Sequence, residues 1–189
     1  MEKYSLAIRP SDEIVFKVKQ VKSLLRTESR TFYSSQNSEA HISIFEYEAG
    51  EKQGRIVSNV FARMVSSLRP FEINYKGFNH FRNGDYYTFY IQLGALASNI
   101  IREYAFIIKK ECRFSLQNKC SVPHMSIGRR LNQDQLDIAY RLFESFEQRD
   151  FCNSFVLRKF NPLRKQYDIV ANMPLLGTEN SKGQLNLFC

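Results

Sequence analysis

Four stretches of the chain repeat apolar side chains every three or four positions, which is the spacing of an amphipathic helix. The first follows a Pro10-Ser11 start and carries acidic residues in its first turn, as helix starts often do. The fourth begins at Asn132, whose side chain forms a capping motif with Gln135 three residues later. The pattern predicts helices over 11–26, 56–68, 96–110 and 132–146.

Other stretches either alternate apolar and polar residues or are short and apolar throughout, which is typical of strands. The turn residues Asn83-Gly84-Asp85 separate two of these stretches and predict a hairpin. The polar segment 27–39 is expected to be a loop. The strands expected from this pattern cover 4–8, 40–48, 71–78, 86–93, 124–131, 151–159 and 166–173.

The expected order of elements places several strands next to each other in the chain, so a regular parallel α/β arrangement is excluded. We expect an α+β protein that is bilobal, with two mostly antiparallel sheets, outer helices and a central cleft. A chain of 189 residues fits one such domain over 1–174, followed by a tail over 175–189.

Two of the expected strands contain nearly the same short motif, HISIF at 41–45 and HMSIG at 124–128. The chain has three histidines, and two of them start this pattern. Residues two apart on a strand point to the same side, so each strand presents an imidazole and a hydroxyl together. One such pattern means little, but two copies in comparable places of the two halves favour a shared functional cleft.

This set of groups suits phosphodiester chemistry. An imidazole can act as base or acid near neutral pH, so one histidine can activate an attacking oxygen while the other protonates the leaving oxygen. The hydroxyls of Ser43 and Ser126 can donate hydrogen bonds to the non-bridging phosphate oxygens. Such a mechanism needs no metal, and the sequence shows no cluster of carboxylates and histidines that indicates one, so no cofactor is expected.

Two H-apolar-[ST]-apolar motifs about eighty residues apart resemble those of the 2H phosphoesterase superfamily, which includes 2′-5′ RNA ligase-like and cyclic phosphodiesterase proteins. The opening YSLAIRP and the Gly-Arg after the second motif are also similar, and the resemblance covers roughly 1–173. It implies a bilobal fold with a pseudo-two-fold axis and metal-independent action on 2′,3′-cyclic phosphates or 2′-5′ linkages. It also implies that His41 and His124 are the acid/base pair, and that Ser43 and Ser126 hold the phosphate.

Further residues near the two motifs are candidates for substrate contact: Arg129, Arg130, Phe45 and Tyr33. Strand alternation puts Arg130 on the face of His124 and Ser126, and Arg129 on the other face, unless Gly128 bends the strand. Phe45 shares the alternation of His41 and can stack on a base, although core packing explains it equally well. Tyr33 lies in the polar loop before the first motif and can flank the cleft.

The net charge of +8 and the pI of about 9.4 favour a phosphate-rich partner, such as an RNA end or a nucleotide phosphodiester. The four cysteines form no zinc-type cluster and are expected to be reduced thiols of a cytoplasmic protein. No apolar run is long enough for a membrane span, so we expect no membrane partner. The protein is expected to be a monomer.

Two alternatives to a phosphodiesterase stay open at this point. One is an RNA-end binding module with little turnover, which His→Ala changes would distinguish by leaving binding largely intact. The other is a hydrolase of a small phosphodiester that is not RNA, whose binding would depend much less on salt.

Overall fold

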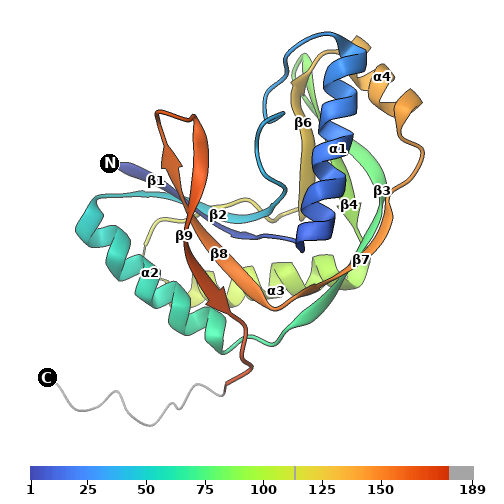
Figure 1. Cartoon of the computed structure of the whole chain (residues 1–189). Helices are drawn as coiled ribbons and strands as arrows, with labels where there is room; N and C mark the ends of the chain where they lie inside the picture. Colours follow the sequence, from blue (N-terminus) through green and yellow to red (C-terminus); the bar gives the residue numbers. More distant parts are fainter. Residues whose placement is uncertain (113, 179–189) are drawn as a thin grey trace, which may run out of the picture.

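The computed structural model of the chain describes residues 1–112 and 114–178 (Figure 1). These residues form four helices: α1 (Asp12–Ser29), α2 (Glu51–Ser66), α3 (Ala95–Glu111) and α4 (Gln133–Leu142). The strands are β1 (Glu2–Ile8), β2 (Ile42–Ala49), β3 (Phe71–Asn83), β4 (Tyr86–Leu93), β5 (Gln117–Asn118), β6 (His124–Leu131), β7 (Glu147–Cys152), β8 (Ser154–Asn161) and β9 (Gln166–Pro174).

The expected α+β class and the antiparallel strand pairing are confirmed. The strands run in the order β7-β3-β4-β6-β2-β1-β8-β9, with β5 added beside β2. We call β7, β3, β4 and β6 the β3 half, and β2, β1, β8 and β9 the β1 half. The two halves meet where Ile42 of β2 pairs with Met125 of β6, so the two expected sheets are joined into one curled sheet.

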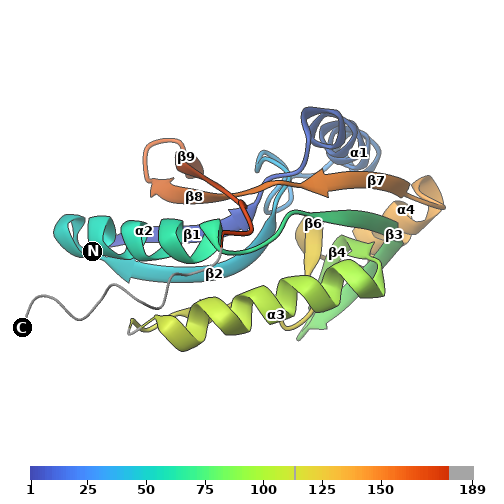
Figure 2. The same cartoon turned by 90° about the horizontal axis from the view of Figure 1, so that it is seen from below.

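The two halves repeat the same arrangement. Reading outward from the junction, β6-β4-β3-β7 in one half corresponds to β2-β1-β8-β9 in the other. The helices α1 and α4 pack against each other and against β6, while α2 contacts β2, β8 and β9, and α3 contacts β2, β3 and α2. Figures 1 and 2 show this division, with α1 and α4 at one end of the molecule and α2 at the other. The two motif strands, β2 and β6, are therefore the innermost strands of their halves.

The sequence pattern predicts the helices well, because each helix buries one stripe of apolar side chains that repeats every three or four residues. The expected capping motif is present at α4, where Asn132 accepts from the Gln135 amide and Gln135 returns the bond to the Asn132 amide. The helix ends at Leu142, earlier than expected, and Phe146 is buried beyond it. Helix α2 begins at Glu51, five residues before the expected start at 56. The apolar pattern does not predict this first turn, because the turn is polar and largely exposed.

The last part of the sheet differs from the expected hairpin. Residues expected as one strand over 151–159 belong to two strands, which are separated at Asn153. Before this residue β7 pairs with β3, and after it β8 pairs with β1, so the chain passes here from one half to the other.

The tail expected from residue 175 is attached at its start. Leu175 is buried, and its amide donates to the Asn153 carbonyl. The amides of Leu176 and Thr178 donate to the Ser66 carbonyl at the end of α2. Residues 179–189 of the expected tail, with Cys189, lie outside the described residues.

Candidate active site

The junction between the two halves brings the two His-x-Ser segments together. Ile42 and Met125 are paired and fully buried, so their side chains point into the core. Their neighbours in the chain, which are the motif histidines and serines, point to the opposite face of the sheet. With this antiparallel register His41 faces Ser126 and Ser43 faces His124, so the two imidazoles stand diagonally across the junction.

Both histidines are held in the same way. The Nδ1 of His41 lies 2.7 Å from the Glu39 carbonyl oxygen, and the Nδ1 of His124 lies 2.8 Å from the Val122 carbonyl oxygen. A carbonyl oxygen can only accept, so Nδ1 must carry the proton in each ring. In the neutral form Nε2 is therefore unprotonated in both histidines, ready to accept a proton.

The surroundings lower the pKa of both histidines. For His41 the pKa falls well below the usual value, because the ring is removed from water and the charge of Arg158 is close. For His124 desolvation is again the main cause, opposed by its bond to the Val122 carbonyl and assisted by the charge of Arg129. Arg129 also lowers the pKa of His41, so its positive charge acts on both rings.

A β-bulge follows each motif serine. In β2 the partners of Ala7 and Leu6 are Ser43 and Phe45, so Ile44 is an extra residue. In β6 the partners of Tyr90 and Phe89 are Ser126 and Gly128, so Ile127 is an extra residue. Each extra isoleucine is fully buried. A bulge of this kind shifts the alternation of side chains by one, so every later residue of the strand changes face.

The bulge in β6 reverses the expected orientation of the two arginines. Arg129 pairs with Thr88, two residues before Tyr90, so it shares the face of His124 and Ser126. Arg130 is itself an extra residue with a left-handed backbone, φ 58°, and its guanidinium lies 5.2 Å from the Tyr86 ring centre. The change of alternation comes from the extra residue Ile127 directly before Gly128, and Arg129 is the arginine that faces the histidines.

The bulge in β2 turns Phe45 away from the cleft. Phe45 pairs with Leu6, and both side chains are fully buried in the core. The expectation that Phe45 stacks on a base is therefore wrong. Tyr33 is also buried, and its hydroxyl donates to the Lys22 carbonyl of α1 at 2.8 Å, so it supports the loop instead of flanking the cleft.

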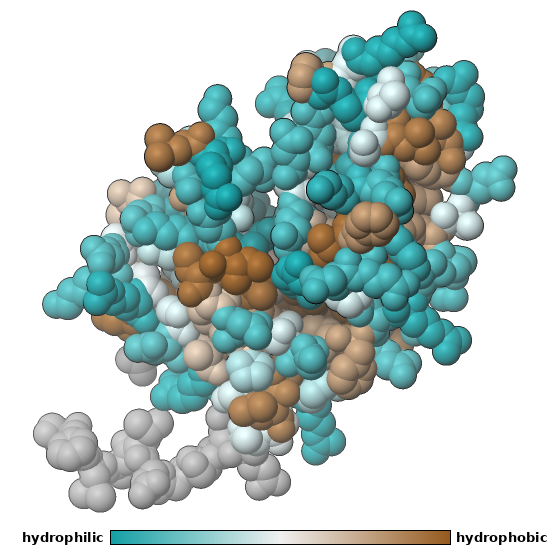
Figure 3. Space-filling view, in the orientation of Figure 1, coloured by the Kyte–Doolittle hydropathy of each residue, from teal (hydrophilic) through white to brown (hydrophobic). Residues whose placement is uncertain are grey.

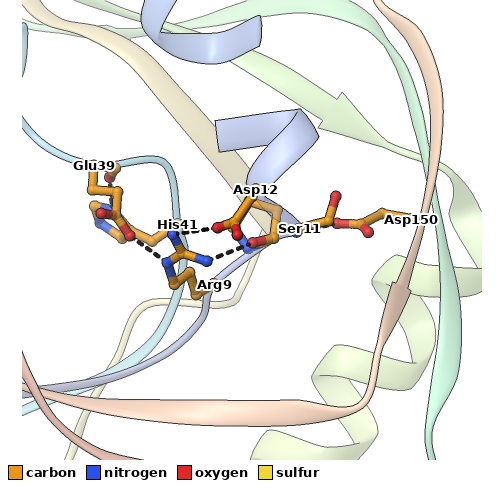
Figure 4. A network of polar contacts seen from close by, with 7 residues as sticks. Arg9, Ser11, Asp12, Glu39, His41 and Asp150 are labelled. Carbon is orange, nitrogen blue, oxygen red and sulfur yellow. Dashed lines mark hydrogen bonds and ion pairs between the residues drawn. The ribbon is translucent and has the colours of Figure 1, made fainter. Parts of the chain in front are cut away.

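The loop before His41 is fixed by charged groups. The Arg9 guanidinium binds the carboxylates of Glu39 at 2.6 Å and Asp12 at 2.8 Å (Figure 4). Since the Glu39 carbonyl accepts from His41, this ion pair fixes the partner of the imidazole. At the same place the Ser11 amide donates to Asp150 of β7, which connects the start of α1 to the β3 half.

Sequence reasoning missed three side chains beside the histidines. Phe81 and Tyr90 stack on each other, with ring centres 4.3 Å apart, and both contact the His124 ring at about 5 Å. Arg158 of β8 lies in a cavity that His41 also lines. No local signal identifies these residues, because their position depends on which strands become neighbours.

The chain thus carries a fold of two sheet halves that meet at a pair of histidines. The family model of the 2′-5′ RNA ligase superfamily matches residues 10–164, and the chain belongs to that superfamily. No curated protein sequence matches the chain.

Solved structures with the same fold include TT0787 of Thermus thermophilus, at 14% identity and a TM-score of 0.68, covering 94% of this chain and 99% of that one. E. coli LigT complexed with 3′-AMP has 11% identity and a TM-score of 0.59, with 92% and 98% covered. Kluyveromyces marxianus Usb1 has 12% identity and a TM-score of 0.56, also with 92% and 98% covered. At these identities the likeness concerns the fold.

Other observations bear on partners and cofactors. In the part of the chain that the structure describes, no group of three or more His, Cys, Asp or Glu side chains is arranged to hold a metal ion. None of the four helices is both long and apolar enough to cross a membrane, as far as the described residues go. His80 lies on β3, where its Nδ1 is 2.8 Å from the Tyr140 hydroxyl, on the opposite face of the sheet from Phe81 and His124.

Proposed function

We propose that the protein is a metal-independent phosphodiesterase that acts on 2′,3′-cyclic phosphates of RNA ends or nucleotides, or on 2′-5′ linkages. One observation carries the proposal: the pairing of Ile42 with Met125 directs two imidazoles and two hydroxyls to the same face of the sheet. Membership of the 2′-5′ RNA ligase superfamily supports the same reaction class. The structure of LigT with 3′-AMP is consistent with a nucleotide in this fold.

In the proposed reaction a water oxygen attacks phosphorus while the Nε2 of one histidine takes the water proton. The bond from phosphorus to the 2′- or 3′-oxygen breaks, and the second histidine, protonated, gives its Nε2 proton to that oxygen. The products are a free hydroxyl and a phosphate monoester. With a ribose 5′-hydroxyl in place of water, the same steps open the cyclic phosphate: the bond from phosphorus to the 3′-oxygen breaks, that oxygen is protonated, and a 2′-5′ bond is made.

The other groups of the junction stabilise the phosphate. The two imidazoles lie on one diagonal of the junction, and the hydroxyls of Ser43 and Ser126 lie on the other. From there the hydroxyls can donate hydrogen bonds to the non-bridging phosphate oxygens. Arg129 adds a positive charge close to both histidines. Phe81 is half-buried beside His124 and offers a ring face to a nucleobase.

We further propose that the protein acts as a monomer with one bilobal domain over residues 1–174, in the cytoplasm. The free thiols of Cys112 and Cys152 fit a reducing environment.

The test is hydrolysis of nucleoside 2′,3′-cyclic phosphates in EDTA by the wild type, His41→Ala and His124→Ala. Each variant is expected to lose about 10²–10⁴-fold in kcat, the usual contribution of a positioned acid or base. His80→Ala is the matched control, because it removes the third histidine, which points to the opposite face of the sheet from Phe81 and His124, and it should keep full activity. Turnover that requires a metal, or that survives in either motif variant, would contradict the proposal. If wild type and variants bind RNA ends equally without turnover, the protein is a binding module.

A further inference from the structure

A buried arginine beside His41 has no ion-pair partner among the described residues. Arg158 on β8 is 7% exposed, and its Nη2 donates to the Ser5 hydroxyl at 2.8 Å. Its Nε has no hydrogen-bond partner among the described residues, and its guanidinium lies 5.2 Å from the centre of the Tyr167 ring. A desolvated guanidinium with unused donors is costly unless an anion compensates it. Burial lowers the pKa of Arg158 to about 10, although Tyr167 and the more distant carboxylates of Glu46 and Glu39 oppose the shift.

Arg158 lines a cavity of about 440 Å³ between the β8–β9 hairpin and the segment before β2. Figure 3 shows a notch with mostly hydrophilic walls beside this hairpin. The cavity contains other charges, but they are already paired: Arg9 binds Glu39, and Arg164 binds Asp168. Among the described charged groups that line the cavity, the Arg158 guanidinium is thus the one without an ion-pair partner.

The cavity lies next to the reacting groups without including most of them. His41 is part of its lining, whereas His124, Ser43 and Ser126 are not. The charge of Arg158 is close enough to lower the pKa of the His41 imidazole. An anion in the cavity would therefore lie beside the two-histidine junction and not between its two imidazoles.

The two halves differ at this position. Arg158 pairs with Ser5 on β1, and the corresponding pair in the other half is Phe81 with Thr88 on β4. An aromatic ring thus stands next to His124, where a guanidinium stands next to His41. One end of the junction suits a nucleobase and the other suits a phosphate, so the site has a direction for a nucleotide chain.

We propose that the Arg158 cavity binds a second phosphate of the substrate, one nucleoside away from the phosphodiester that reacts. The inference rests on the proposed function and narrows its substrate class to nucleotides that carry a further phosphate. That phosphate is either a terminal monoester or the internucleotide link of an RNA end, and both present the same anionic oxygens to the guanidinium.

Three substrates that differ by one group test the proposal. They are adenosine 2′,3′-cyclic phosphate, the same molecule with a 5′-phosphate, and the dinucleotide ApA with a terminal 2′,3′-cyclic phosphate. The wild type should prefer the second and third over the first by about ten-fold or more in kcat/KM, mainly through KM, as expected for a charge-assisted hydrogen bond. Preference for the second alone identifies a monoester site, and preference for both identifies a site that accepts the internucleotide link.

Arg158→Met should reduce this preference to about one-fold, and Arg158→Lys should keep part of it. Lys159→Met is the matched control, since it removes one positive charge from the next residue of β8, which is paired with Glu2. The control should keep the preference. Equal rates on all three substrates, or a preference that survives Arg158→Met, would overturn the Arg158 proposal and leave the phosphodiesterase proposal standing.

If the wild type hydrolyses none of the three, the proposed action on 2′,3′-cyclic phosphates fails and the cavity is tested by binding. Calorimetry would then compare adenosine 3′,5′-bisphosphate with adenosine 3′-monophosphate. Tighter binding of the bisphosphate that Arg158→Met abolishes would support the cavity, and equal affinities would overturn it.

Discussion

Ile44 and Ile127 occupy the same place in the two halves, because each is the extra residue of a bulge directly after a motif serine. Both side chains are fully buried, so the bulges are fixed by the core. Each bulge lies directly after the motif serine, so the regular alternation that places His and Ser on the same face ends there. The isoleucine that follows both serines in the sequence is thus part of how the motif is presented.

The bulge at Ile127 leads to a prediction about two adjacent arginines. Arg129→Met should lower kcat/KM by about 10- to 100-fold, because a charged donor to the phosphate is lost. Arg130→Met should change it by less than about three-fold, because this side chain stands over Tyr86. Steady-state kinetics with a cyclic phosphate would decide, and a larger loss for Arg130 would show that the strand alternates without the bulge.

The lowered histidine pKa values lead to a prediction about pH. The proposed mechanism requires one neutral and one protonated imidazole, and this combination is most populated between the two pKa values. Since both lie below 6.5 in the free protein, kcat/KM should peak below pH 6.5 and fall as the pH rises through 7. A bound phosphate anion raises both values, so the optimum for kcat should lie at higher pH.

The same shifts set a direction for stability. The unfolded chain binds protons below pH 6.5 that the folded protein does not, so the free energy of unfolding should decrease as the pH falls below 6.5. NMR titration of the imidazole nitrogens would check the order, with His41 titrating at lower pH than His124. Titration of either ring above 6.5 in the free protein would contradict the electrostatic account.

Lys22 gives a prediction that separates positioning from stability. Its ammonium is buried and donates to the Ser38 carbonyl, the Ser38 hydroxyl and the Ser35 carbonyl, within the loop that leads to His41. Burial lowers its pKa to about 8. Lys22→Met should reduce kcat/KM about ten-fold by loosening this loop. The free energy of unfolding should change by less than about 2 kcal/mol, because the lost hydrogen bonds are offset by removal of a desolvated charge.

Kinetics and denaturant unfolding of Lys22→Met would be compared with Lys19→Met, which changes an exposed lysine of the same helix. The control should match the wild type in both measurements. Unchanged kinetics in Lys22→Met would mean that the loop keeps its shape without the ammonium.

The sequence predicts the parts of this protein that depend on local periodicity. The spacing of apolar and polar residues alone predicts the four helices, most strands and the Asn132 cap. The two motifs are recognised because the same short sequence occurs twice. The orientations of Arg129 and Phe45 could not be predicted. Each depends on a bulge, whose position is set by pairing with the neighbouring strand and is not visible in the local pattern of apolar and polar residues. The position of Arg158 requires knowing that β8 lies beside β1, about 150 residues earlier in the chain.

The break at Asn153 could not be predicted either. The sequence pattern from β7 to β8 is typical of one nearly continuous strand, yet its two parts pair with different halves of the sheet. Tertiary pairing decides where such a strand changes partner, and local propensity does not.

The place of β1 between β2 and β8 has a consequence for synthesis on the ribosome. Tyr4 pairs with Tyr47 on one side and with Lys159 on the other, so one edge of β1 has no partner until residues 154–161 have left the exit tunnel. A nascent chain that ends at β7 exposes this apolar edge, which is a site for aggregation or for chaperone binding. The protein thus completes the half that carries His41 last, although that half contains β1, which precedes the other described strands in the chain.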